Sequence, residues 1–83
     1  MPKNTLYADR RNKLWAGVVA VLHSPGHTEH SREIAAGITA SKTTAQKEKW
    51  LHKSIPVHML ELIWGPRGFL QKIHANEAAE AQD

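Results

Sequence analysis

Apolar residues recur at helical spacing along most of the chain, so the hydrophobic pattern predicts helices and no strands. The first helix is expected over residues 5–23. Its apolar stripe consists of Tyr7, Leu14, Trp15, Val18, Val19, Val21 and Leu22. The longest uninterrupted apolar run, Leu14–Leu22, has nine residues, which is too few to cross a membrane. The Ser-Pro-Gly sequence at 24–26 should end this helix, because Pro-Gly is a strong turn signal.

The middle third of the chain predicts two short helices joined by a turn. After a loop or helix start at His27–His30, either Thr28 or Ser31 would cap the first of them. A tight turn at Thr39–Ala40 would follow, and Ser41 would cap a second helix that extends to about Lys53. The buried face of the first helix would be formed by Ile34, Ala35 and Ile38.

The last third predicts one further helix and a short helical end. Ser54-Ile55-Pro56 breaks the chain, and Pro56 suits the first turn of the next helix. Gly65-Pro66 stops that helix, and 76–83 is expected to be a flexible acidic tail. The apolar stripe of the helix would be Val57, Leu60, Ile63 and Trp64, and Phe69, Leu70 and Ile73 would cover the core in a last turn or two. The prediction is therefore an all-α fold of about five short helices with a central helix-turn-helix, in one domain over residues 1–75.

Composition narrows the class of partner. The chain has no cysteine, which excludes disulfides and thiolate metal sites and favours a cytoplasmic location. Residues 1–53 hold nine Lys or Arg against four acids, whereas residues 54–83 hold two against four, within a net charge of +3. A basic front and an acidic end suit a polyanionic partner on one side of the molecule.

Residues 31–53 carry the residue types of a repressor motif in corresponding places. Ile34 and Ala35 supply the apolar and small residues where the two helices would cross, and Ile38 and Ala40 the apolar residues around the turn. The second helix opens with hydroxyl, basic and small inward-facing residues, namely Ser41, Lys42, Thr43, Thr44 and Ala45. The segment resembles the helix-turn-helix of bacterial and phage repressors. It departs from that pattern in two places. Thr39 stands where the turn usually has a glycine. The second inward position of the second helix falls at Glu48 or Lys49, where an apolar residue is expected, so Trp50 or Leu51 would have to fill it.

A wider layout supports this resemblance. Lys53-Ser54-Ile55-Pro56-Val57 follows the motif, and it is similar to the tryptophan repressor family, where a Lys-rich stretch precedes a helix that opens with Pro-Val. The similarity is one of layout, and it identifies no tryptophan pocket, corepressor or other cofactor.

The resemblance implies a sequence-specific transcriptional regulator, expected to be a repressor that binds double-stranded DNA as a homodimer. Either the first helix or the Val57–Ile73 region would form the dimer surface. Lys42, Thr43, Gln46 and Lys47 would project toward the bases, because Gln pairs well with adenine and Lys with guanine. Thr44 belongs to the same helix opening. The expected phosphate contacts are Arg32, Ser41, Lys49 and Lys53.

Other functions have weaker signals in the sequence. His23, His27 and His30 lie near Glu29 and Glu33, but the cluster spans a Pro-Gly turn, so we expect solvated loop histidines and no metal site. No residue spacing indicates a nucleophile, a triad or a phosphate loop, so no enzyme is predicted.

Two alternative functions remain open. One is an RNA-binding domain, and the other is a protein-binding inhibitor or adaptor that would use Trp64, Phe69 and Leu70. Trp15, Trp50 and Trp64 are expected to anchor the core, with Trp50 in either the core or a dimer contact.

Overall fold

The computed structural model describes residues 3–23, 29–53, 55 and 57–82, and these form five helices with no strand among them. The helices are α1 (Lys3–Leu22), α2 (Glu29–Ala40), α3 (Thr44–Trp50), α4 (Val57–Trp64) and α5 (Phe69–Gln82). The all-α fold with five helices is therefore confirmed.

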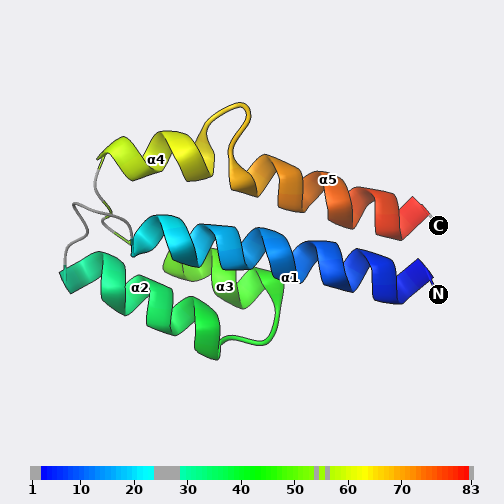
Figure 1. Cartoon of the computed structure of the whole chain (residues 1–83), viewed down its shortest axis with the longest axis horizontal. Coiled ribbons are helices and arrows are strands. Elements are labelled where there is room, and N and C mark those ends of the chain that lie inside the picture. The colour runs from blue at the N-terminus through cyan, green and yellow to red at the C-terminus, as the bar shows by residue number, and fades with distance from the viewer. Residues whose placement is uncertain (1–2, 24–28, 54, 56, 83) are drawn as a thin grey trace.

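Helix α1 is the centre of the molecule. It packs against α5 and α4 on one side and against α2 on the other, and α3 packs against α2 (Figure 1). The predicted stripe of α1 is confirmed at Trp15, Val18 and Leu22, which are buried. Each such large apolar side chain stabilises the fold by roughly 1.5–3 kcal/mol on burial. Figure 1 also shows that the two ends of the chain lie at the same end of the molecule.

Helix α2 is longer than the sequence pattern predicts. Ile34, Ala35 and Ile38 are buried as expected. Ser31 is buried inside the helix, so the prediction that it could be the N-cap is wrong. The predicted turn at Thr39–Ala40 is also wrong, because both residues are helical. The Thr39 hydroxyl donates to the carbonyl oxygen of Ala35 at 2.9 Å, which lets this Thr remain within a helix without a strained turn.

Helix α4 turns a different face to the core than predicted. Met59 and Ile63, four residues apart, are buried, whereas Val57 is 81% exposed and Trp64 is 38% exposed. Leu60 is exposed as well, so the predicted stripe is wrong except at Ile63. The reason is that α4 is apolar on both faces, and a hydrophobic period cannot choose between two apolar faces.

The break after α4 is confirmed at Gly65-Pro66. Position 68 also requires a glycine, since a Cβ atom on Gly68 would lie 2.7 Å from the carbonyl oxygen of Ile63. Leu70 and Ile73 of α5 are buried, and Phe69 packs partly against the core, as the sequence predicts.

Helix α5 continues through the segment predicted to be a flexible tail. It is helical to Gln82, and Asn76 is only 8% exposed. The side-chain amide of Asn76 donates to the carbonyl oxygen of Tyr7 at 3.1 Å. Arg11 and Glu80 lie 3.6 Å apart and join α1 to the last turns of α5. Alanines at 75, 78, 79 and 81 favour the helix here, and the contacts with α1 hold it in place.

Some predictions lie outside the described residues. These are the Pro-Gly turn at 24–26, the cap at Thr28, the position of His27, and Pro56 in the first turn of α4. Across the described part of the chain, no helix combines the length and the hydropathy needed to cross a membrane.

Candidate nucleic-acid interface

Helix α3 begins two residues later than predicted, and Thr43 is its N-cap in place of Ser41. The Thr43 hydroxyl accepts a hydrogen bond from the backbone N–H of Gln46 at 3.1 Å, and the Gln46 side chain in turn accepts from the backbone N–H of Lys42 at 3.2 Å. This is close to a capping box, and the sequence Thr43-Thr-Ala-Gln46 carries its signature. That signal identifies the true start of α3. The Ser41 hydroxyl instead donates to the carbonyl oxygen of Gly37 at 2.7 Å.

Lys47 supports the fold and does not project toward a ligand, contrary to the prediction. Its ammonium group donates to the carbonyl oxygens of Ile38 and Ser41, each at 2.7 Å, where α2 ends. A cation at this position gives the carbonyls at the end of a helix a further donor and complements the helix dipole. Burial lowers the pKa of Lys47 from its ordinary value of 10.5. The turn between α2 and α3 is therefore held by a lysine that the sequence motif assigned to base contacts.

The outward face of α3 is free of carboxylates. The single acid of the helix, Glu48, is turned toward α5, where His74 Nε2 donates to its Oε1 atom at 3.0 Å. Leu51, at the C-cap, is buried, and it is one of the two residues predicted as alternatives for the second inward position. Ala45, predicted to face inward, is exposed together with Gln46 and Lys49. These three residues, at helical spacing, form the outward face.

Trp50 joins α3 to α2 beside this outward face. Its indole ring lies directly against Gly37, where an added Cβ atom would come within 2.6 Å of the ring carbon Cε3 and closer still to two others. The Lys53 ammonium lies 4.9 Å from the centroid of the same ring, which is a cation–π distance. Trp50 is partly buried and packs against the core cluster, in agreement with one of its predicted roles.

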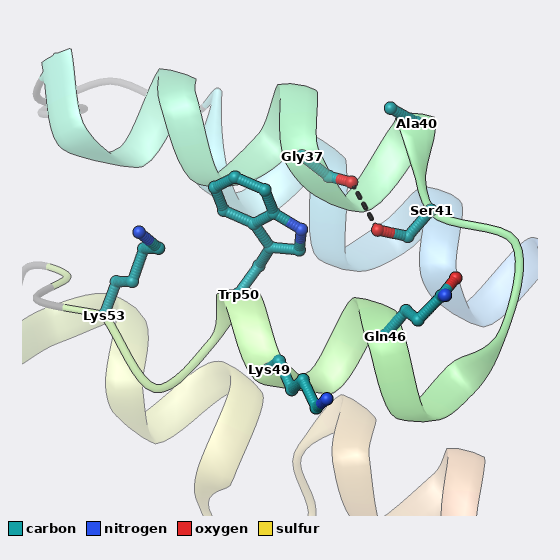
Figure 2. Close-up of a pocket in the computed structure, with 7 residues that line it drawn as sticks. All are labelled: Gly37, Ala40, Ser41, Gln46, Lys49, Trp50 and Lys53. Atoms are coloured by element: carbon teal, nitrogen blue, oxygen red, sulfur yellow. Dashed lines mark hydrogen bonds between the residues drawn. The ribbon is translucent and has the colours of Figure 1, made fainter.

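A shallow hollow of about 480 Å³ lies between α2 and α3 at this place. Figure 2 shows the Trp50 ring pointing toward Gly37 of α2, with Lys53 to one side of the ring and Lys49 extending away from α2. The predicted DNA-contacting residues that line the hollow are Ser41, Gln46, Lys49 and Lys53. The hollow is therefore basic on the α3 side and has an aromatic wall.

The other residues predicted to contact DNA do not all lie in this hollow. Lys42, Thr43 and Thr44 line a second hollow, together with Ala45, Arg11 and Glu77, so they are separated from the Trp50 hollow. Arg32 is exposed on α2 and lines neither hollow. The ammonium groups of Lys42, Lys49 and Lys53 form no ion pair with the carboxylates of the described residues. The predicted set is thus divided between the Trp50 hollow, a second hollow that also holds Glu77, and the exposed surface of α2.

No protein-family model, curated protein or solved structure matches the chain.

The histidines contribute no metal site among the described residues. His23 and His30 are exposed, and no group of three potential ligands comes together in the described part of the chain. His52 instead contacts the Trp64 ring, with ring centroids 5.3 Å apart. Trp64 is therefore a partly covered surface residue, and its predicted role as a core anchor is wrong.

Proposed function

We propose that the chain binds duplex DNA with the outward face of α3 and acts as a sequence-specific regulator. One observation carries the proposal. The outward face presents Ala45, Gln46 and Lys49, while the only carboxylate of the helix, that of Glu48, is bonded to His74 on the opposite side. A helix with this polarity brings no carboxylate of its own to a polyanion, and the nearby acid of α5, Glu77, lies in a hollow that it shares with the cations Arg11 and Lys42.

The exposed residues have side chains suited to the major groove. The Gln46 amide can pair with adenine, Lys49 can donate to the acceptors of guanine, and the Ala45 methyl can contact thymine. Lys42 precedes this face and Lys53 follows it, so the two ammonium groups flank it in the sequence as phosphate contacts would. Lys47 has no place in this set, because its ammonium group is bonded to α2.

A homodimer completes the proposal. Helix α3 has seven residues, so one copy can touch few base pairs, and paired half-sites are the usual way to gain affinity and specificity. Of the two predicted dimer surfaces, α1 already packs against three other helices. Helix α4 instead exposes Val57, Leu60 and Trp64 on one face.

The α4 stripe suits a second copy of the chain. It carries no Lys or Arg, so the cations of two basic molecules would not meet there, and the exposed Glu61, which borders the stripe at helical spacing from Val57 and Trp64, would lie at the rim of the contact. In an antiparallel two-fold contact, Val57 of one copy would lie opposite the larger Trp64 of the other, which is the self-complementary arrangement that such a contact needs.

Sedimentation measurements test the dimer. The wild type should sediment as a dimer at the concentrations used for DNA binding, and Leu60→Glu should sediment as a folded monomer, because it buries a charge in the contact. Ala36→Glu, an exposed change on α2, is the matched control and should remain a dimer. A monomeric wild type, or a dimeric Leu60→Glu protein, would exclude this surface.

Fluorescence anisotropy with duplex DNA tests the binding function. A random-sequence duplex measures phosphate contacts, and selection from a duplex library gives a preferred site. The double variant Lys49→Ala/Lys53→Ala should weaken binding by about tenfold or more, since a base contact contributes roughly 1–3 kcal/mol. The charge-matched control Lys13→Ala/Lys72→Ala removes two exposed lysines from α1 and α5 and should bind nearly as well as wild type.

Two outcomes would reject the proposal. Equal losses in both double variants would mean that net charge alone holds the DNA. A preference for single-stranded or A-form RNA over duplex DNA would instead establish the RNA-binding alternative.

A further inference from the structure

A second surface, between α1 and α5, is basic and apolar at once. A shallow groove of about 480 Å³ lies there, on a face of α1 other than the one that packs against α2. Its floor consists of Leu14, Ala75 and Ala79. Its cationic residues are Arg10, Lys13 and Lys72. Figure 1 shows α5 running alongside α1 here, which gives the groove two helical walls.

The acidic side chains of α5 lie on a different side of the helix from Lys72, which lines the groove. Glu80 is paired with Arg11, and Glu77 lines the hollow beside Lys42, so both carboxylates lie away from this groove. No carboxylate lines the groove, and its three cations form no ion pair among the described residues. Lys72 lies 5.6 Å from the centroid of the Phe69 ring, so its only described partner is aromatic.

The apolar floor continues beyond the groove toward α4. Lys72 also lines a neighbouring hollow of about 630 Å³, which adds Phe69, the exposed Leu62 and another cation, Arg67. One acid, Glu61, lies at the edge of that hollow. At the other end, Leu6 is exposed and lies four residues before Arg10, on the same face of α1. From Phe69 to Ala79 the surface follows α5 for about 15 Å, or nearly three helical turns.

We propose that this α1–α5 groove binds an acidic amphipathic helix of a partner protein. An apolar stripe of about three turns would lie on Leu14, Ala75 and Ala79, and carboxylates on both sides of the stripe would meet the cations of the two walls. Recognition of this kind, in which a helix lies in a groove, uses anchors at i, i+3, i+4 and i+7. The site is separate from α3, so it stands or falls independently of DNA binding.

Other occupants fit the surface less well. A second copy would bring the same cations face to face, which repels. Nucleic acid would satisfy the cations and leave the apolar floor against water or sugar. A surface of anionic lipid also matches basic and apolar residues, but it is flat, whereas this surface is a groove between two helices.

The test uses a fluorescein-labelled peptide of about 18 residues, long enough to be helical, with Leu at the i, i+3, i+4 and i+7 positions and Glu on the flanks. Binding is read by anisotropy with the full-length chain. Two control peptides have the same composition in scrambled order, or Lys in place of Glu. The acidic amphipathic peptide should bind, and both controls should bind at least about tenfold more weakly.

Variants of the chain locate the peptide. Lys13→Glu/Lys72→Glu reverses two groove charges and should weaken peptide binding about tenfold, because each exposed charge pair contributes a small amount that reversal makes repulsive. Ala75→Glu, which places a carboxylate on the exposed floor, should also weaken it. Lys49→Glu/Lys53→Glu, on the DNA-binding surface, should not. Circular dichroism checks that each variant retains the helicity of the wild type.

Four results would overturn the proposal. Equal loss in the groove and α3 variants would show binding by net charge, and equal binding of the scrambled peptide would show that no helical stripe is read. Binding to phosphatidylserine vesicles without binding to the peptide would identify a lipid surface. Self-association that disappears in Lys13→Glu/Lys72→Glu would identify a second copy as the occupant. None of these results affects the α3 variants in the DNA assay, so the two proposals fail separately.

Discussion

The contact between Gly37 and Trp50 fixes how α3 sits on α2, and replacing Gly37 with Ala tests it. The added methyl group would overlap three carbons of the indole ring, the farthest of them at 2.6 Å. Since the ring is only partly buried, it can move, but it then loses its packing against α2 and its position under Lys53.

Two opposing effects determine how much Gly37→Ala changes the free energy of unfolding. Alanine in place of glycine inside a helix stabilises by about 0.8–1.0 kcal/mol. Overpacking at a close contact costs about 1–3 kcal/mol, and the overlap here involves the face of a rigid ring, which places it in the upper part of that range. Gly37→Ala should therefore lower the free energy of unfolding by about 1–2 kcal/mol. In a Trp50→Ala background the clash is gone, and the same change should raise it by about 0.8–1.0 kcal/mol.

Urea titrations of the four proteins in this double-mutant cycle measure the coupling between the two residues. The predicted coupling is about 2–3 kcal/mol, which equals the cost of the clash, because the helix gain is the same in both backgrounds and cancels. Ala36→Gly, at an exposed position of α2, calibrates the glycine effect in this helix and should cost about 1 kcal/mol. If Gly37→Ala stabilises the protein equally with and without Trp50, the two residues do not touch, and the arrangement of α2 and α3 described above is wrong.

Two further changes test contacts that hold the helices in place. Lys47→Met keeps the length of the side chain but removes the donor to the carbonyls of Ile38 and Ser41, so urea titration should show a loss of about 1–3 kcal/mol; a loss below about 0.5 kcal/mol would contradict the capping role. Asn76→Asp cannot donate to the Tyr7 carbonyl when ionised, and thermal melts should show a loss of about 1–3 kcal/mol at pH 7. The loss should shrink at about pH 3, where the protonated carboxyl group donates again, and an equal loss at both pH values would argue against this hydrogen bond.

The sequence predicts the helices of this chain better than it predicts their faces and ends. The stripe of α1 has one apolar side, so Trp15, Val18 and Leu22 could be assigned to the core from spacing alone. In α4 the same reasoning selects Val57 and Trp64, which are exposed, because the helix has apolar residues on both sides. The length of α5 depends on contacts with α1 that are distant in sequence, and no local pattern reports them.

The candidate site shows the same limit. The cationic character of 41–53 follows directly from its residues, as does the need for an apolar residue near position 51. Which lysine is available does not follow, because Lys47 bonds to carbonyls of α2 and Lys49 does not. The pair Thr43 and Gln46 indicates the start of α3, but Ser41 is an equally good N-cap by its hydroxyl group alone.

The salt dependence of DNA binding tests the central proposal most directly. The two proposed phosphate contacts, Lys42 and Lys53, should give a slope of log affinity against log salt of roughly −2 per protomer, since each neutralised phosphate contributes about −0.9. In Lys49→Ala/Lys53→Ala the slope should fall in magnitude by about 1, to roughly −1, because Lys53 is the one proposed phosphate contact of this pair. A wild type that does not bind duplex DNA at low salt, or a double variant whose slope is unchanged, would contradict the proposal that α3 is the DNA-binding surface.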